Sequence, residues 1–190
     1  MAGQAKNHLV TPLGRASFVS LIEPREFNGR LAYEISLLFP PGTDLRELEA
    51  AINAEAAVKF PHGRPANFHS PLQAAESKKS YQAFKGWTVV KFKSNQRPQV
   101  TEPAPNPTAG ARVVDCDPKR VYSGCWVRVS YHAFGYVGRK GGNGVTMTLH
   151  NVLWQRDDEP LAGSSAMDEF DAIDPHAFTG EAPPDTSFLG

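Results

Sequence analysis

Residues 125–136 form two interleaved series, each taking every second position. One series is apolar (Cys125, Val127, Val129, Tyr131 and Ala133), and the other sets large rings beside cations (Trp126, Arg128, Ser130, His132, Phe134 and Tyr136). A period of two predicts a β-strand whose two faces differ. Because the apolar series already supplies a core face, we expect the second face to meet solvent or a ligand.

The same period predicts four more strands, at residues 15–24, 30–42, 86–94 and 145–154. In the strand at 86–94, Thr88, Val90 and Phe92 are expected to face the core, and Trp87, Val89, Lys91 and Lys93 the other side. Asn143-Gly144 has the composition of a tight hairpin turn between the last two strands. Residues 1–14 are expected to form a loose arm, 61–86 an irregular segment and the proline-rich 97–112 a mobile loop.

Residues 44–60 predict one α-helix. Leu45, Leu48 and Ile52 share a face, and Asp44 with Glu47 three residues later fits a capping box. Five strands with one helix after the second strand, together with long loops, favour a mainly β fold. We expect a five-stranded antiparallel OB-type barrel, with a β-sandwich as the alternative.

Charge divides the chain into two parts. Residues 1–156 hold all 20 Lys and Arg against 11 Asp and Glu, a net of +9, and residues 157–190 have a net of −9. A basic body suggests a polyanionic partner. We therefore expect a binding domain over 1–156 and a disordered acidic tail over 157–190. The tail either docks a protein or competes for the basic surface.

Rings alternating with Lys and Arg suit single-stranded nucleic acid, because unstacked bases lie on the rings and phosphates pair with the cations. The predicted nucleic-acid surface comprises Trp126, Arg128, His132, Phe134, Tyr136, Arg139, Lys140, Trp87, Lys91, Lys93 and Arg97. The alternative is a second core, in which loops or the helix bury the same rings.

No motif indicates an enzyme, a cofactor or a metal site. "GRKGGNG" lacks the spacing of a phosphate loop and precedes a strand. Zinc would need a pair such as His132 and His150, which lie on separate strands without the usual spacing. Asp157 and Asp158 are better explained as a loop than as a magnesium site. Because the N-terminus carries no secretory signal, we expect Cys116 and Cys125 to be reduced in a cytosol.

Several stretches resemble a family of phage-encoded single-stranded-DNA-binding proteins. They are "LLFPPGTDLRELEAAI", "PLQAAESKKSYQAFKGW", "KSNQRPQV", "VYSGCWVRVSYHAFGY" and "GVTMTLHNVLWQRDDEPL", followed by "SAMDEFDAI". The most specific feature is "YSGC" followed about twenty residues later by "GVxxxLxNV". The resemblance implies an OB-type fold that coats single-stranded DNA during phage replication or recombination, in the cytoplasm of the bacterial host. It places the aromatic and basic face on Trp126, Arg128, Phe134 and Tyr136, flanked by Lys91, Lys93 and Arg97.

Acidic tails of proteins that coat single strands often end in a phenylalanine that binds replication partners. Here the chain ends "DTSFLG", so Phe188 is not terminal. The expected docking element is therefore Asp168, Glu169, Phe170 and Asp171. A structural or adaptor β-domain that meets another protein through its aromatic face is the alternative function. The sequence leaves the oligomeric state open.

Overall fold

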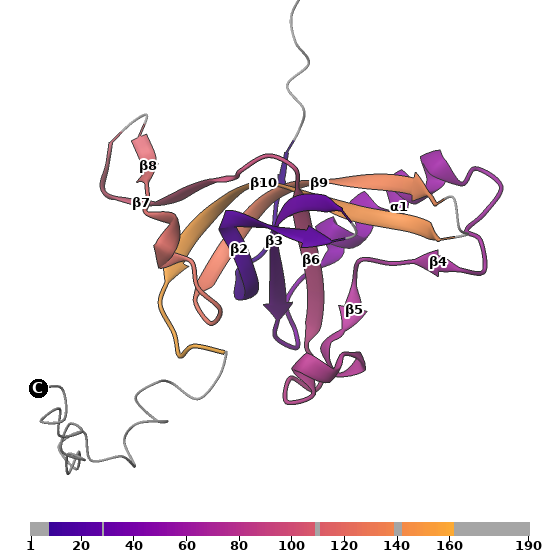
Figure 1. Ribbon diagram of the computed structural model, residues 1–190, viewed down its shortest axis with the longest axis horizontal. Helices are drawn as coiled ribbons and strands as arrows, with labels where there is room; N and C mark the ends of the chain where they lie inside the picture. The colour runs from indigo at the N-terminus through magenta and orange to yellow at the C-terminus, as the bar shows by residue number, and fades with distance from the viewer. Residues whose placement is uncertain (1–7, 28, 109–110, 139–141, 162–190) are drawn as a thin grey trace, which may run out of the picture.

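The computed structural model describes residues 8–27, 29–108, 111–138 and 142–161 (Figure 1). Its α-helix is α1 (Arg46–Lys59), and the 3-10 turns are η1 (Ala75–Ser77), η2 (Lys79–Tyr81) and η3 (Pro118–Arg120). The strands are β1 (Leu9–Val10), β2 (Gly14–Phe27), β3 (Arg30–Phe39), β4 (Phe68–His69), β5 (Gln73–Ala74), β6 (Thr88–Ser94), β7 (Gln99–Thr108), β8 (Ala111–Asp115), β9 (Trp126–Val137) and β10 (Asn143–Arg156). The expectation of a mainly β fold with one α-helix is confirmed for these residues.

Five strands pair in a closed circuit. β9 pairs with β2, β2 with β3, β3 with β6, β6 with β10, and β10 returns to β9. The sheet as a whole has ten strands, because β1, β4, β5, β7 and β8 add to the edges of this circuit. The expectation of five strands in total was therefore wrong, although all five predicted strands belong to the circuit.

β10 pairs with four other strands of the sheet. One of its edges pairs with β9 along almost its whole length, as the paired arrows in Figure 1 show. It also pairs with β4, β6 and β7 in turn, and these three pairings are parallel. The sheet is consequently mixed, not purely antiparallel as expected.

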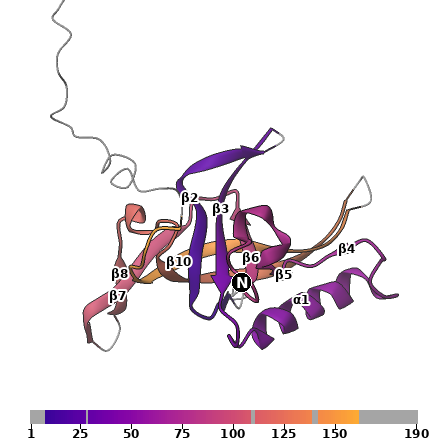
Figure 2. The same ribbon diagram turned by 90° about the horizontal axis from the view of Figure 1, so that it is seen from below.

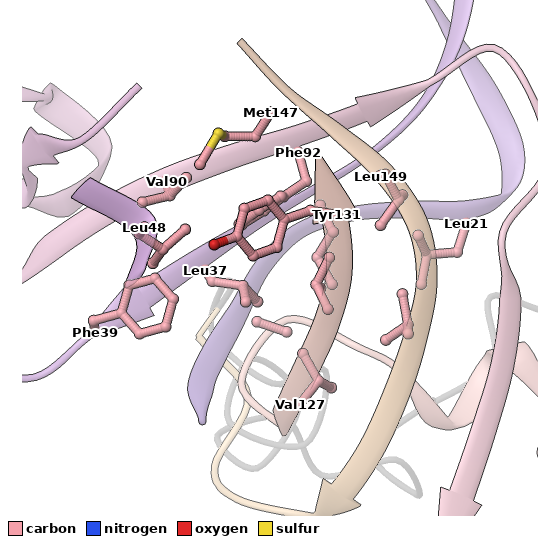
Figure 3. Close-up of a cluster of buried hydrophobic side chains, with 14 of the residues drawn as sticks. Leu21, Leu37, Phe39, Leu48, Val90, Phe92, Val127, Tyr131, Met147 and Leu149 are labelled. Carbon is pink, nitrogen blue, oxygen red and sulfur yellow. The ribbon is translucent and has the colours of Figure 1, made fainter. Parts of the chain in front are cut away.

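The core lies inside the circuit, with α1 packed against β9 and β10 (Figure 2). Tyr131 sits at its centre beside Phe92, with ring centroids 5.6 Å apart (Figure 3). Leu48, Ile52 and Ala56 form the buried stripe of α1. This stripe is the helical face predicted from the sequence, and it closes the core below the hairpin of β9 and β10.

Three local expectations were wrong. Residues 97–112 contain β7 and the beginning of β8, because prolines at alternate positions of β7 remove amides from only one edge of the strand. Part of the supposed N-terminal arm forms β1, which pairs with β9. Asn143 and Gly144 pair with Val137 and Tyr136 inside the ladder, so they lie in β10 and not in the turn.

The start of α1 also differs from the expected capping box. Leu45 occupies the N-cap position and makes no side-chain cap bond, and the helix begins at Arg46. Asp44 lies one residue earlier and accepts a hydrogen bond from the Arg46 backbone N–H at 3.1 Å. The Arg46 guanidinium also donates to this carboxylate, which lowers the pKa of Asp44 to about 2.

Two further findings bear on the chemistry of the chain. Cys116 and Cys125 are buried free thiols, and burial raises the pKa of Cys125 to about 11. A thiol held protonated in this way is a poor nucleophile. Among the described residues, no helix combines the length and the apolar character that crossing a lipid bilayer requires.

Candidate nucleic-acid interface

β9 has the two faces that its sequence predicts. Val127, Val129 and Tyr131 are fully buried in the core, while the intervening residues are partly or largely exposed. The face outside the core continues across β10 and β6, because Lys93 pairs with Thr148 and Thr148 pairs with His132. We call this surface the outer face and define it by Lys91, Lys93, Thr146, Thr148, His132, Phe134 and Tyr136.

The end of the outer face near the tip of the β9–β10 hairpin is open. Phe134 is 53% exposed, although it lies within a strand and opposite Thr146. Tyr136, two residues further along, lines a hollow of about 580 Å³ together with Lys78, Lys91 and Lys93. This part of the outer face therefore brings two rings and three ammonium groups to one side of the sheet.

Glu34 on β3 holds the cations of this region in place. Its carboxylate lies 3.4 Å from Lys91 Nζ, 3.8 Å from Lys93 Nζ and 3.6 Å from Arg25 Nη1. The Glu34 side chain is only 11% exposed, whereas the Lys91 and Lys93 side chains are 40% and 43% exposed. One recessed carboxylate thus orients two lysines that still present their ammonium groups to solvent.

Lys78 was not among the predicted site residues, because it follows η1 in a segment without periodicity. Its pKa is lowered, chiefly because burial disfavours the ammonium and secondly because Lys91 is close by. Two ammonium groups that repel each other, such as Lys78 and Lys91, are stabilised by an anion placed between them. Glu34 was missed as well, since a single acidic residue in a strand gives no signal of its own.

The middle of the outer face carries two histidines in contact. His132 Nδ1 lies 2.6 Å from His150 Nε2. Arg97, in the turn between β6 and β7, is exposed and lines the same hollow as both histidines. The antiparallel pairing of β9 with β10 therefore brings these two histidines into contact, although they lie on separate strands. Their position on separate strands was the argument against a zinc-binding pair.

Trp126 and Arg128 lie at the other end of β9 and interact with neighbouring segments. The Trp126 indole N–H donates to Asp158 Oδ2 at 2.6 Å, and the Arg156 guanidinium lies 4.7 Å from the Trp126 ring centroid. Arg128 donates to the Thr11 carbonyl at 3.2 Å. Residues 158–161 therefore remain packed against the sheet, with Tyr122 donating to the Asp158 carbonyl at 2.7 Å.

The segment from 75 to 87 covers the outer side of β3 and β6 around the paired residues Leu38 and Val89. Leu38, Ala75, Tyr81 and Val89 form a buried cluster there, and Trp87 packs against it. The Trp87 and Phe84 rings are 5.2 Å apart and nearly perpendicular. The second-core alternative thus describes Trp87, while Phe134 on β9 stays open.

The remaining predicted residues lie outside the described part of the chain. They are Arg139 and Lys140 in the β9–β10 connection and Asp168, Glu169, Phe170 and Asp171 in the C-terminal segment.

Comparisons with known proteins agree with the resemblance found in the sequence. A family model described as the single-stranded-DNA-binding protein of Enterobacter phage Enc34 matches residues 7–179. "Putative protein p50" of Acyrthosiphon pisum secondary endosymbiont phage 1 is 26% identical over 174 residues, covering 84% of this chain and 90% of that protein.

Solved structures share the fold. The C-terminally truncated single-stranded-DNA-binding protein of bacteriophage Enc34 matches with a TM-score of 0.62 and 22% identity, covering 82% of this chain and 89% of that one. The Enc34 protein in complex with single-stranded DNA matches with a TM-score of 0.62 and 20% identity, covering 83% and 91%. The single-stranded-DNA-binding protein gp2.5 of bacteriophage T7 has a TM-score of 0.59 and 17% identity, covering 93% and 100%. Because the family model spans most of the sequence, the chain belongs to the family of the phage Enc34 single-stranded-DNA-binding protein.

Proposed function

We propose that this protein binds single-stranded DNA, largely without sequence preference, along the open part of the outer face. Bases would stack on Phe134 and Tyr136, and phosphates would pair with Lys78, Lys91, Lys93 and Arg97. The observation that carries the proposal is the 53% exposure of Phe134 beside a lysine-lined hollow. A flat ring exposed beside cations offers an uncoiled strand both a stacking surface for a base and partners for its phosphates.

The closed circuit of strands supports an OB-type barrel as the scaffold. The spatial order is β2-β3-β6-β10-β9 and back to β2. Numbered along the chain, the first strand of the circuit (β2) therefore pairs with the fourth (β9), and the third (β6) runs parallel to the fifth (β10). Such a barrel presents one curved face to an extended strand. Duplex DNA would leave Phe134 without a partner, because its bases are already stacked on each other.

Salt dependence tests the proposal. We expect the affinity for a fluorescein-labelled oligothymidylate, followed by anisotropy, to fall with salt at a slope of about −0.7 per neutralised phosphate. Changing Lys91 and Lys93 together to alanine should reduce the slope by about 1.4 if each lysine neutralises one phosphate. Lys119→Ala is the matched control, because this exposed lysine lines a different hollow beside β2. Binding that does not respond to salt would refute the proposal.

We further propose that the protein is not an enzyme and acts in phage DNA replication or recombination in the host cytoplasm. Asp157 lies 4.0 Å from Arg120, and Asp158 accepts from Trp126 and lies 3.7 Å from Arg15. These cations occupy the carboxylates that a magnesium-dependent nuclease would need. Full retention of a labelled oligonucleotide after incubation with the protein and Mg²⁺ is the expected result, and shortened strands would contradict it.

The acidic C-terminal segment would compete with DNA for the basic surface or dock a partner protein. Residues 158–161 pack against the sheet, so the informative truncation ends at Leu161 and not at Arg156. It removes six acidic residues and no basic ones. We expect residues 1–161 to bind DNA more tightly than the full chain at low salt. Equal affinity would leave partner docking as the role of the segment.

An adaptor that binds another protein is the alternative. Phe134 is an exposed ring on the outer face of β9, which a protein partner would cover in place of a base. Val137 is exposed too, but it lies on the opposite face of the strand. A shift of a labelled oligonucleotide in a native gel distinguishes the two functions, because an adaptor predicts no shift at physiological salt.

A further inference from the structure

We infer that His8, His132 and His150 form a binding site for a divalent transition metal such as Zn²⁺. One ligand nitrogen from each of these residues lies within 4.8 Å of the other two. The three residues come from different parts of the chain: His8 directly precedes β1, His132 lies in β9 and His150 lies in β10. Three imidazoles with an open fourth position are a donor set that proteins use to hold zinc.

The register of the sheet explains why the three side chains meet. Leu9 on β1 pairs with Tyr131, so His8, the preceding residue, lies next to His132 along the same antiparallel ladder. Leu9 packs against the core, as Tyr131 does, and alternation therefore turns His8 outward with His132. The His8 and His150 rings are 3.9 Å apart between centroids.

A β-bulge brings in the third ligand. Leu149 pairs with Tyr131 and Asn151 pairs with Ser130, so His150 is an extra residue in β10 with no position opposite it on β9. A bulge of this kind re-aims a side chain. His150 Nε2 lies 2.6 Å from His132 Nδ1 as a result.

The spacing needs only small side-chain movements to accept a metal. Zn–N bonds of about 2.0–2.1 Å in a tetrahedral site place the nitrogens about 3.3 Å apart. The 2.6 Å pair has to open slightly, and the third nitrogen, within 4.8 Å, has to approach. The hollow beside the cluster has a volume of about 460 Å³ and leaves room for the fourth ligand, a water molecule or an anion drawn by Arg97.

The donor chemistry selects the ion. All three donors are imidazole nitrogens, which suit Zn²⁺, Cu²⁺ and Ni²⁺, whereas Mg²⁺ and Ca²⁺ require oxygen ligands. His8 directly precedes the two residues of β1, which pair with β9 at Tyr131 and Ser130. A metal held by all three histidines would therefore fasten this edge of the sheet to β9 and β10.

Metal titration of the full chain, without DNA, tests the site separately from nucleic-acid binding. Protein stripped with chelator is titrated with ZnCl₂ by calorimetry, and with Co²⁺ to record the visible absorption of a tetrahedral site. We expect one Zn²⁺ per chain, no heat with Mg²⁺, and a thermal midpoint that rises on adding Zn²⁺. His8→Gln removes a direct ligand, so it should weaken Zn²⁺ binding by more than the roughly 10- to 100-fold that loss of an outer-shell partner costs, and abolish the rise.

His62→Gln is the matched control, because His62 is an exposed histidine outside the cluster. His8 precedes the sheet, so His8→Gln is expected to fold normally, and circular dichroism verifies this. His150→Gln gives an independent variant in β10 and should weaken binding to a similar extent. Sub-stoichiometric binding by the wild type, or equal losses in His8→Gln and His62→Gln, would overturn the inference.

Discussion

The exposed ring of Phe134 gives the sharpest test of how the outer face is used. Phe134 lies on β9 opposite Thr146, and its side chain is 53% exposed. Phe134→Ala removes the ring and leaves Lys91, Lys93 and Tyr136 in place. Phe134→Leu is the matched variant, because it keeps an apolar side chain of similar reach and loses only the flat face on which a base can stack.

The expected effects on binding and on folding differ enough to be separated. Loss of one stacked base costs about 1–3 kcal/mol, which weakens binding about 5- to 150-fold. Full burial of a Phe side chain contributes about 1.5–3 kcal/mol, and a ring this exposed contributes about half of that or less. We therefore expect Phe134→Ala to lower the free energy of unfolding by about 1 kcal/mol, so that the variant remains folded.

Two measurements on the same preparations decide the outcome. Anisotropy with a labelled oligothymidylate gives the dissociation constant, and urea denaturation gives the free energy of unfolding. Both Phe134→Ala and Phe134→Leu should bind weakly, whereas Trp126→Phe should bind as the wild type does, because Trp126 is engaged by Asp158 and Arg156. Wild-type affinity in Phe134→Leu would refute stacking at this position. Unfolding of Phe134→Ala would instead place the ring in the core.

Three further predictions concern charge, pH and backbone. Glu34→Gln keeps a polar side chain of the same shape near Lys91 and Lys93 but removes its charge, so it should tighten DNA binding about 2- to 5-fold at low salt. Weaker binding in the anisotropy assay would show that the carboxylate's positioning of the two lysines outweighs its competition with phosphate. The pKa of Asp158 is lowered, chiefly by the hydrogen bond from Trp126, so its stabilising contribution is complete above the ordinary Asp value of about 4 and is lost as the pH falls through the lowered value. Tryptophan emission should change over that acidic range in the wild type and not in Asp158→Asn, and identical titrations would contradict the assignment. A Cβ at Gly124 (φ +125°) would collide with the Glu159 carbonyl, so Gly124→Ala should cost about 1–3 kcal/mol in urea denaturation, more than Gly42→Ala, where φ is also positive but the space is open.

Periodicity predicted the elements that bury one face and expose the other. β9 follows its alternation from Trp126 to Tyr136, and the helical spacing of Leu48 and Ile52 gave the buried stripe of α1. β7 was missed because its prolines suggest a loop, although they lie beyond residues 99–101, the part of β7 that pairs with β10, and leave its pairing with β8 possible. In β10 the inward position passes from Leu149 to Val152, since the bulge at His150 shifts the register by one residue, whereas uninterrupted alternation would place Leu153 inward.

The sequence pattern could not predict where the irregular segments pack. Trp87 and Phe134 belong to equivalent series in the sequence pattern, yet Trp87 packs against the buried cluster that contains Ala75 and Tyr81, while Phe134 stays open. Segments of this kind have no period, so the sequence does not reveal which strand they will cover. His8 was missed for a related reason, because a two-residue strand is too short to show alternation.

The outward-facing residues of β9 fall into three regions of different chemistry, which depend on the segment that lies beside each of them. At one end, Asp158 and Arg156 engage Trp126, and the chain after β10 is fixed there. In the middle, β1 and the bulge in β10 place His8 and His150 around His132. Only the far end leaves a ring exposed beside lysines, and this end meets the physical requirements of an uncoiled polynucleotide. Binding along this strand should therefore depend on Phe134 and Tyr136 far more than on Trp126, even though all three belong to one alternating series.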